Sequence, residues 1–411
     1  MQNTGLSVQK NILWNSAGSI IALGCNWLMT IMVVRLSNGY DSAGVLALAM
    51  TIGNIFTPFA TYKMRTYQIS DVDNEYSAGE YFTFRVVTTS LALAGCIVYA
   101  VATCQQSAIC SIVLFLLYKC IDQFTDVMHG VDQKHRRMDY IGVSLATRGI
   151  LGLLAFCCIL RMSNDLNFAI IAMIVSNLPI TIGFDYPKAR QFCEFSFGIS
   201  LSRMRRLFQE CFTAVLSAVF CSAVLTVPRQ LLSYLFGDAT LGIYASIAAP
   251  VTLVQMGATY IYVPLLGEFS GYFRDGRKAE FKKLLGKVTV GIVLVALGCI
   301  ALFSFFGEWG LVLLFGDSII PYVYLLRPAI ICTVITAYLW FMSDLFVSIR
   351  CFRENFVANL LSVIASLAAS FPCVSIWDMN GVSYSGIIGY GAGVIIMLVY
   401  LRRILRSLGA K

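Results

Sequence analysis

The sequence predicts an all-α, polytopic membrane protein with about twelve transmembrane helices, arranged as two six-helix lobes around a central cavity. Three observations support this fold class. The 411 residues are 58% hydrophobic and only 13% charged, and the mean hydropathy is +0.77. Apolar runs of roughly 20 residues, the length that crosses a bilayer as a helix, recur along the chain. A pattern in the first half of the chain also returns in the second half.

About twelve apolar runs are long enough to span a membrane. The clearest are Ile12–Val34, Ala43–Tyr62, Thr83–Thr103, Val288–Phe306, Phe356–Val374 and Val382–Leu401. The others are Ser111–Met128, Tyr140–Leu160, Phe168–Phe184, Cys211–Leu232, Gly242–Pro264 and Tyr322–Val347. The first run is longer than the core of a signal peptide and lacks a small-residue cleavage site, so we expect it to remain as the first span.

An internal repeat indicates two related lobes. Ala60-Thr61-Tyr62 recurs 198 residues later as Ala258-Thr259-Tyr260, and Gly95-Cys96-Ile97 resembles Gly298-Cys299-Ile300. Short matches also arise by chance in so apolar a sequence, but their shared order favours a duplication. We therefore predict an N-terminal lobe (residues 1–200) and a C-terminal lobe (residues 201–411), related as parallel repeats because six spans is an even number.

The chain has a net charge of +8, and the placement of its basic residues indicates membrane topology and argues against nucleic-acid binding. Basic residues gather in alternate loops, while the intervening loops hold few. The basic loops contain Lys134, Arg136, Arg137, Lys188, Arg190, Arg203, Arg205, Arg206, Arg274, Arg277, Lys278, Lys282, Lys283, Lys287, Arg350, Arg353, Arg402, Arg403 and Arg406. Cytoplasmic loops of membrane proteins carry this excess, so we expect both termini in the cytoplasm.

The cysteines and histidines predict no metal site and no bound cofactor. None of the 14 cysteines forms a CxxC motif. Cys104 and Cys110 fall in one expected external loop, which leaves a disulfide open. The two histidines, His129 and His135, are too few and too loop-bound for a metal site. A coupling ion, H⁺ or Na⁺, is the only small cofactor that we expect.

Polar residues follow one face of the second predicted span and one face of the eighth. The second span carries Asn54, Thr57, Thr61 and Arg65, and the eighth carries Thr252, Gln255 and Thr259. Spacings of three and four residues place each set on one side of a helix. Threonines also bond their own backbone and amides also join helices, so a purely structural role is open. We expect the two stripes to form opposite walls of one aqueous cleft.

Charged residues in or at the ends of spans are the second group of candidates. They are Arg35, Lys119, Arg148 and Arg229, together with Asp344. A charge at the centre of a spanning helix costs about 2.5–3.5 kcal/mol on the insertion scale, so such residues usually serve a function. Residues near helix ends also reach the headgroups by snorkelling. Asp344 has no obvious partner nearby in the sequence, and we expect it to couple transport to an ion.

A cleft with more cations than acids, walled by hydroxyls and amides, suits an anionic head group that carries sugars. Arginine and lysine bind phosphate. Transfer of a bare pyrophosphate through hydrocarbon costs on the order of tens of kcal/mol. A wet, basic groove would let the head group cross while a lipid tail stays in the bilayer, with two rocking lobes giving alternating access.

Several motifs resemble those of the Wzx-type polysaccharide flippases of the multidrug/oligosaccharidyl-lipid/polysaccharide exporter (MOP) superfamily. They are Lys10-Asn11, Arg35 followed by Gly44, Pro228-Arg229, Leu241-Gly242-Ile243-Tyr244-Ala245, His129-Gly130-Val131-Asp132-Gln133 and Asn380-Gly381-Val382-Ser383-Tyr384. The resemblance implies a two-lobed transporter in a bacterial plasma membrane. It also implies a substrate, an undecaprenyl-pyrophosphate-linked sugar repeat unit, and a cationic cavity that includes Arg65, Arg148 and Arg229.

Two other functions are weighed against this one. A drug or organic-cation antiporter of the same superfamily needs a buried carboxylate in an early span, and the first run, Ile12–Val34, contains no acid. An enzyme of polysaccharide assembly would carry a large external loop, and the expected external loops are short. We therefore expect a non-enzymatic, monomeric transporter whose partners are the bilayer, the lipid-linked oligosaccharide and a polysaccharide polymerase.

Overall fold

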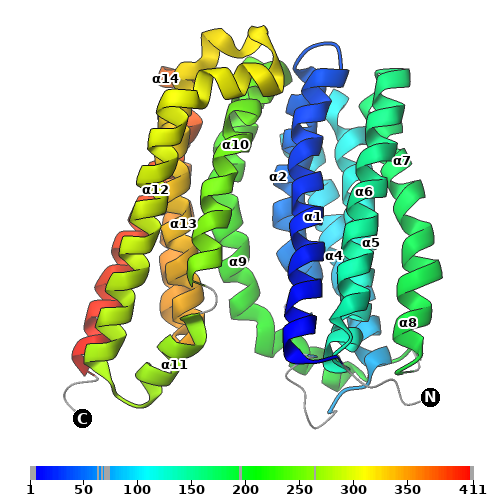
Figure 1. Cartoon of the computed structure of the whole chain (residues 1–411), viewed down its shortest axis with the longest axis vertical. Helices are drawn as coiled ribbons and strands as arrows, with labels where there is room; N and C mark the ends of the chain where they lie inside the picture. Colours follow the sequence, from blue (N-terminus) through cyan, green and yellow to red (C-terminus); the bar gives the residue numbers. More distant parts are fainter. Residues whose placement is uncertain are drawn as a thin grey trace. The chain divides into compact units, whose positions relative to one another are not determined.

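In the computed structural model the chain is described over residues 6–62, 64, 65, 68, 75–193, 197–262 and 265–407, and every regular element in these residues is helical (Figure 1). The α-helices of the first half are α1 (Val8–Leu36), α2 (Asp41–Thr61), α4 (Ala78–Thr103), α5 (Gln106–Lys134), α6 (Met138–Ser163), α7 (Leu166–Ile180) and α8 (Tyr186–Arg190). Those of the second half are α9 (Leu201–Phe236), α10 (Asp238–Tyr262), α11 (Leu266–Arg274), α12 (Lys278–Phe315), α13 (Leu326–Ser348) and α14 (Phe352–Ser407). The predicted all-α class is confirmed.

The helices agree with the twelve predicted spans. Ten helices among the described residues are long and apolar enough to cross a membrane. One of them, α14, is interrupted at Trp377 and Asp378, which leave helical geometry, so it contains the last two predicted runs. The predicted run Gly242–Pro264 corresponds to α10, a helix of 25 residues. Together these helices account for all twelve runs.

The chain divides into two compact units, Met1–Val215 and Leu216–Lys411, which we call unit 1 and unit 2. The division falls inside α9, which therefore contributes to both units. The predicted boundary at residue 200 lies just before the first residue of this helix. Each unit is described by itself below.

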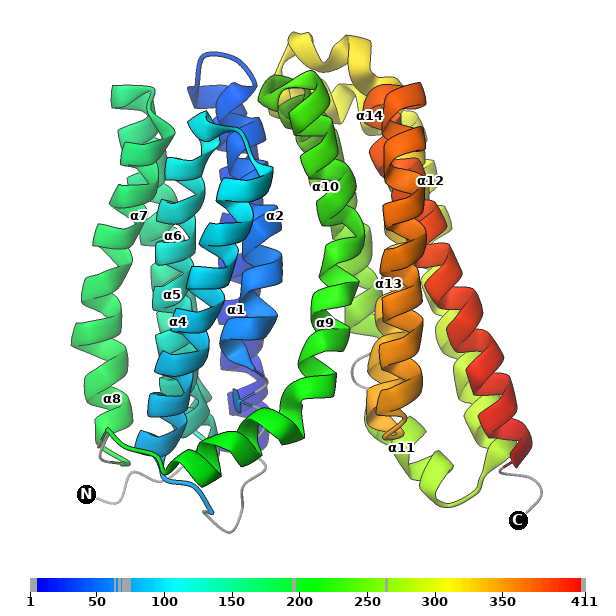
Figure 2. The same cartoon turned by 180° about the vertical axis from the view of Figure 1, so that it is seen from behind.

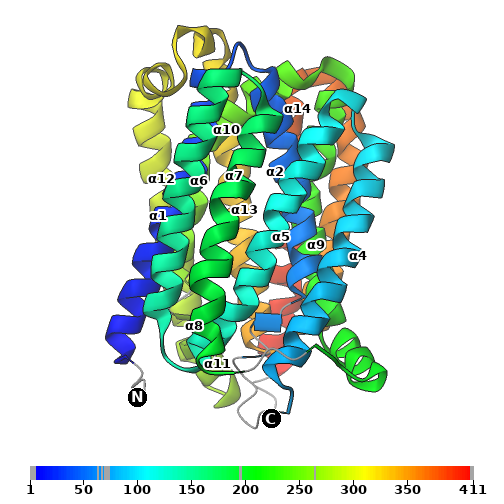
Figure 3. The ribbon, with the colours of Figure 1, turned by 90° about the vertical axis from the view of Figure 1, so that its right-hand side faces the viewer.

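In unit 1, α1 lies along α6 at very short range (Figure 3). A Cβ atom at Gly18 would collide with the backbone of Gly142, and one at Gly142 would collide with the carbonyl group of Trp14. Only glycine permits the two helix backbones to approach this closely. The contact fixes α6, and with it Arg148, against α1.

The helix α5 packs against α2, α4 and α7 in unit 1 (Figure 2). It begins after Gln105 and continues to Lys134, beyond the predicted end of the run at Met128. His129 therefore lies inside a helix and is buried, so the expectation of a loop-bound histidine was wrong. Cys104 and Cys110, near the start of α5, are free thiols, so the disulfide left open by the sequence does not form.

The chain leaves α7 through a wider helical turn, the π-helix η1 (Thr181–Asp185). Pro179 lies just before it and lacks a backbone N–H, which breaks the regular hydrogen-bond ladder. The Thr181 hydroxyl lies 3.1 Å from the hydroxyl of Thr125 on α5. This turn brings the Asp185 carboxylate, which is buried, to α5. Turns of this kind often occur at functional sites.

Unit 2 is held together by aromatic packing and by small residues at a helix crossing. The rings of Phe269 and Phe281 lie 5.2 Å apart, and Phe341 of α13 extends the same buried core. Where α14 folds back on itself, the Ser362 hydroxyl donates to the Gly389 carbonyl at 2.7 Å. A Cβ atom at Gly389 would press into neighbouring side chains, so this crossing also needs glycine.

Candidate functional site

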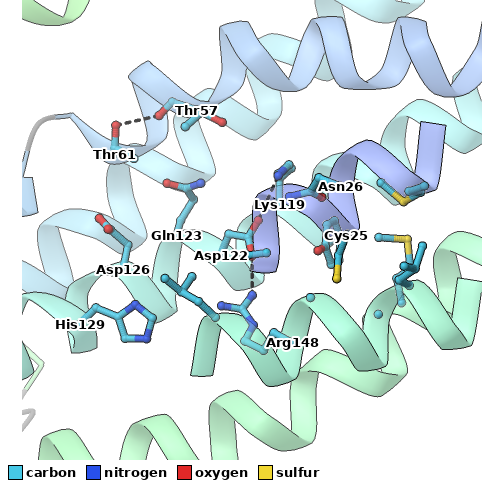
Figure 4. Close-up of a pocket in the computed structure, with 18 of the residues that line it drawn as sticks. Cys25, Asn26, Thr57, Thr61, Lys119, Asp122, Gln123, Asp126, His129 and Arg148 are labelled. Carbon is cyan, nitrogen blue, oxygen red and sulfur yellow. Dashed lines mark hydrogen bonds and ion pairs between the residues drawn. The ribbon is translucent and has the colours of Figure 1, made fainter. Parts of the chain in front are cut away.

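A cavity of about 280 Å³ lies within unit 1, lined by residues of α1, α2, α5, α6 and α7 (Figure 4). We call it the cationic cavity. Its polar and charged lining consists of Cys25, Asn26, Thr57, Thr61, Arg65, Tyr118, Lys119, Asp122, Gln123, Asp126, His129 and Arg148. Of the predicted site residues, it therefore brings together Thr57, Thr61, Arg65, Lys119 and Arg148.

The helix α5 supplies the row of titratable groups along this cavity. Asp122, Asp126 and His129 follow one another at intervals of four and three residues, which places them on one face of the helix. All three line the cavity, and Lys119 lies one turn before Asp122 on the same helix. His129 is buried and Asp122 and Asp126 are half-buried against the other helices of unit 1, so the charges of the row need partners there.

Asp122 is the first centre of charge pairing. Lys119 Nζ lies 3.1 Å from Asp122 Oδ2, and Arg148 Nη2 contacts Asp122 Oδ1 (Figure 4). The same guanidinium donates through Nε to Asn177 Oδ1 on α7 at 3.2 Å. Arg148 is 6% exposed, so its position is fixed by these partners and not by solvent.

Asp126 is the second centre, one turn further along α5. Arg65 Nη1 lies 3.3 Å from Asp126 Oδ1, and Arg85 Nη2 of α4 lies 2.9 Å from Asp126 Oδ2. Arg65 also donates to Gln133 Oε1 at 2.9 Å, and Arg85 donates to Gln123 Oε1 at 3.3 Å. The carboxylate is therefore clamped between two guanidinium groups, an arrangement that gives strong, charge-assisted hydrogen bonds.

The network carries an excess of positive charge. Its members are four cations and two carboxylates: Arg65, Arg85, Lys119, Arg148, Asp122 and Asp126. The side chains of Arg65 and Lys119 are 28% and 25% exposed, whereas those of Arg85 and Arg148 are 0% and 7% exposed. Arg65 and Lys119 are thus able to touch a ligand, while Arg85 and Arg148 hold the carboxylates and add to the positive field. The network therefore gives the cavity a positive electrostatic potential.

Hydroxyl and amide groups complete the wall. Thr57 donates to the Gly53 carbonyl at 2.8 Å, and Thr61 donates to the Thr57 carbonyl at 2.9 Å. These bonds to the helix backbone are the structural role left open by the sequence. Both residues nevertheless line the cavity, and their oxygens keep lone pairs with which to accept hydrogen bonds from a ligand.

Two other predicted residues of unit 1 lie elsewhere. Asn54, on the same helix as Thr57, is exposed and does not line the cationic cavity. Arg35 is exposed in the last turn of α1. An exposed arginine at the end of a spanning helix is typical of a residue that extends to the headgroup region.

The predicted residues of unit 2 lie on α9 and α10. Arg229, Thr252 and Gln255 are half-buried, and the Thr252 hydroxyl donates to the Ala249 carbonyl at 2.7 Å. Thr259 belongs to α10, but its side chain lies outside the described residues. The common cleft with walls from both lobes stays a prediction.

Asp344, the predicted ion-coupling residue, is half-buried in α13 of unit 2. The sequence suggested no partner, but the Tyr262 hydroxyl at the end of α10 donates to Asp344 Oδ2 at 2.9 Å. The partner is 82 residues away in the chain, a separation that no local pattern reveals. Its role in coupling stays a prediction.

Sequence reasoning missed Arg85 and Gln123. Arg85 is fully buried and completes the clamp on Asp126, although it lies only two residues inside the predicted run Thr83–Thr103. A charge so near the end of a run resembles one that reaches the headgroups, which is why it was passed over. The available signal of an interior helix face was the pair of threonines, Thr83 and Thr88, and the pair of phenylalanines, Phe82 and Phe84, around Arg85.

The chain is similar in sequence to a curated bacterial protein. It is 24% identical over 406 residues to the capsular polysaccharide biosynthesis protein CapF of Staphylococcus aureus, and the match covers 96% of this chain and 99% of the relative. No protein-family model matches the chain.

The fold is similar to that of solved membrane transporters. An inward-facing multidrug resistance transporter of the MATE family, within the MOP superfamily, matches with a TM-score of 0.75 and 12% identity, covering 98% of this chain and 99% of the transporter. The lipid II flippase MurJ, in an inward closed conformation, matches with a TM-score of 0.74 and 9% identity, covering 97% of this chain and 90% of the flippase. The chain is a multi-pass membrane protein that has the fold of these solved transporters, as its sequence resemblance predicted.

Proposed function

We propose that the chain is a flippase that moves a polyprenyl-pyrophosphate-linked oligosaccharide from the cytoplasmic to the outer leaflet of a bacterial plasma membrane. The observation that carries the proposal is the excess of cations in a buried cavity of a transporter fold. The similarity to a capsular polysaccharide biosynthesis protein over nearly the whole chain supports the same substrate class.

The pyrophosphate is the part of such a substrate that needs the cavity. Arg65 and Lys119 are the exposed cations that would bind its oxygens, and Asp122 and Asp126 keep these two side chains in place before the ligand arrives. An anion that enters competes with the carboxylates for the same donors. Binding is therefore reversible, as a transporter requires, because the cations return to their carboxylates when the head group leaves.

The cavity volume also bears on the substrate. At about 280 Å³ it accepts a pyrophosphate and the nearest part of a sugar, but not an oligosaccharide of several residues. We propose that the cationic cavity holds the charged head and that the remaining sugars occupy space outside it. Thr57, Thr61 and Asn26 would then bond the first sugar.

A drug or organic-cation antiporter is the alternative, because one of the similar structures is a multidrug resistance transporter. A cation would meet three basic side chains in the lining of this cavity, Arg65, Lys119 and Arg148, and both acids of the lining are already paired. The charge balance therefore favours the anionic, lipid-linked substrate. An enzyme is not supported by the similar structures, which are transporters.

Complementation of a deletion strain tests the proposal. The strain is expected to accumulate undecaprenyl-linked repeat units and to lose its surface polysaccharide, and the wild-type gene is expected to reverse both. Arg65→Gln and Lys119→Gln are expected to fail, because each removes a cation that is accessible to the head group. Arg161→Gln, at the exposed end of α6 and outside the cavity, is the matched control and is expected to complement fully.

Membrane abundance of each variant is measured by immunoblot, so that loss of function is separated from loss of protein. Full complementation by both Arg65→Gln and Lys119→Gln would remove the cationic cavity from the mechanism. If the deletion lowered drug resistance but left the level of lipid-linked intermediates unchanged, the antiporter would be favoured instead. Co-purification of a polysaccharide polymerase would identify the expected protein partner.

A further inference from the structure

A second cluster of titratable side chains lies at the C-terminal end of α5. It consists of His129 and Asp132 of α5 and Asp185 of η1, which are 3%, 0% and 1% exposed. His129 Nε2 lies 3.4 Å from Asp185 Oδ1. We call these three residues the acid–histidine cluster. The proposed binding of the head group does not use it.

The carboxylates of this cluster lack hydrogen-bond donors. Among the described residues, none donates to either oxygen of Asp132 or of Asp185. The side-chain oxygen Oε1 of Gln68 is buried beside Gly130 of α5, and it also has no hydrogen-bond donor among the described residues. An ionised carboxylate that is buried without donors is strongly unfavourable. A proton removes the charge and turns one oxygen into a donor.

The cations near the cluster are paired with other carboxylates. The charged and titratable groups around the cluster are Arg65, Asp126, Arg137, Asp139, Arg148 and Cys193 (Figure 4). Arg137 is held by Asp139 through two hydrogen bonds of 2.9 and 2.7 Å. Arg65 and Arg85 are bound to Asp126, and Arg148 is bound to Asp122. Among the described residues, these ion pairs leave the carboxylates of Asp132 and Asp185 without an arginine or lysine partner.

His129 connects the cluster to the cationic cavity. Its ring lines the cavity, where it is drawn beside Asp126, while its Nε2 faces Asp185 (Figure 4). We propose that His129, Asp132 and Asp185 form a proton-binding site whose occupancy rises when an anion enters the cationic cavity. The proton site stands on the burial and contacts of these residues alone. Only the coupling to the anion rests on the proposed function.

The coupling follows from charge. An anion among Arg65, Lys119 and Arg148 offsets their positive field, which otherwise disfavours a proton on the cluster. One proton then moves from water to the cluster for each anion bound. Coupling between two sites is reciprocal, so protonation also strengthens anion binding, by at most about tenfold for each unit of pH when one proton is taken up.

Infrared difference spectroscopy on the purified full chain, without any substrate, tests the proton site. The wild type is expected to show the carbonyl band of a protonated, buried carboxyl group, which changes as the pH is varied. Asp132→Asn and Asp185→Asn are each expected to reduce or shift this band. Asp41→Asn, at an exposed carboxylate at the start of α2, is the matched control and should leave it unchanged. A wild-type spectrum without such a band would overturn the proposal, and so would a band that sodium ions abolish, because the cluster would then hold sodium.

Calorimetry with inorganic pyrophosphate tests the coupling. In buffers of different ionisation enthalpy, the wild type is expected to take up about one proton per pyrophosphate bound. Asp132→Asn, Asp185→Asn and His129→Gln should bind pyrophosphate with a pH dependence reduced from about tenfold to less than threefold per unit. An unchanged pH dependence in all three variants would overturn the coupling. Failure of the wild type to bind pyrophosphate at all would instead count against the proposed function, while the infrared band would still report on the proton site.

Discussion

Units 1 and 2 are built from the same kind of long, apolar helix, yet they place their charges differently. In unit 1 the described residues form two neighbouring sets of ion pairs inside the helix bundle, one around Asp122 and one around Asp126. In unit 2 the described ion pairs Arg274–Asp275 and Arg277–Glu280 join side chains that are exposed at helix ends. The interior of unit 2 is instead joined by hydroxyl groups and aromatic rings.

The comparison shows that two units built from similar helices need not carry similar sites. The repeat pairs Thr57 and Thr61 of α2 with positions on α10, so it predicted two equivalent polar walls. Three of the four cations of the network, Arg65, Lys119 of α5 and Arg148 of α6, have no basic residue at the offset of the repeat. Close helix packing requires small residues at contacts in both units. The proposed binding of the anion requires charged residues, and these lie in unit 1.

The largest expected effect follows from breaking the buried clamp in unit 1. Arg85→Ala leaves Asp126 with Arg65 alone and opens a cavity in place of a fully buried guanidinium. Removal of one partner from a buried ion pair costs about 3–5 kcal/mol. We expect a large drop in the thermal unfolding midpoint of the detergent-solubilised protein. Arg403→Ala, exposed in unit 2, is the control and should not change it. Equal midpoints for the two variants would show that unit 1 does not depend on its buried charges.

The next effect separates binding from transport. Arg148→Ala and Arg229→Ala are both expected to abolish surface polysaccharide assembly at normal membrane abundance. Only Arg148→Ala should weaken binding of pyrophosphate to the purified protein, by roughly 10- to 100-fold, because it removes one positive charge from the field of the cavity and leaves the Asp122 carboxylate, which Arg148 holds, to repel the anion. Arg229 belongs to unit 2 and does not line the cationic cavity. Equal losses of affinity would contradict the assignment of the anion site to unit 1, and full complementation by either variant would remove that arginine from the mechanism.

The packing part of the comparison predicts similar costs in both units. Gly142→Leu in unit 1 and Gly389→Leu in unit 2 each force a side chain into a close helix contact, which costs about 1–3 kcal/mol. The repeat-related glycines Gly95 and Gly298 have no atoms near an added Cβ, so leucine at either position is the matched control. Thermal unfolding of the four variants measures the difference. A loss of stability in the controls as large as at Gly142 and Gly389 would contradict the close contacts.

Much of the fold was predictable because hydrophobic length is a local property. The runs Ile12–Val34 and Thr83–Thr103 need only counting to become α1 and α4. The end of α5 was placed too early, since His129, Asp132 and Lys134 lower its hydropathy although the helix continues and buries two of them. Polar residues inside a span resemble a loop by any local measure, and in this protein they include residues of the proposed sites.

The candidate site was predictable only in part, because its contacts join distant segments. Lys119 and Asp122 are three residues apart, a spacing at which side chains on a helix meet, so this pair is visible in the sequence. Arg85 and Asp126 are separated by 41 residues, and Arg148 reaches Asp122 across 26. Which helix faces pack together decides those pairs, and the sequence alone does not give that arrangement. The same reason explains why the acid–histidine cluster, built from α5 and η1, had no signature in the chain.

The smallest structural effect is expected at Asp344, the acid of unit 2 that the sequence marks for ion coupling. Asp344→Asn keeps an oxygen that accepts the hydrogen bond from Tyr262, so the loss of stability should be about 1 kcal/mol or less. The charge is lost, however, and we expect transport in proteoliposomes to become independent of an imposed pH or sodium gradient. Because Asp344 belongs to unit 2, the infrared band assigned to the cluster in unit 1 should stay unchanged in this variant. Unchanged gradient dependence would remove Asp344 from coupling and leave the acid–histidine cluster as the titrating group, in which case the difference in charge between the two units would extend to the coupling ion as well.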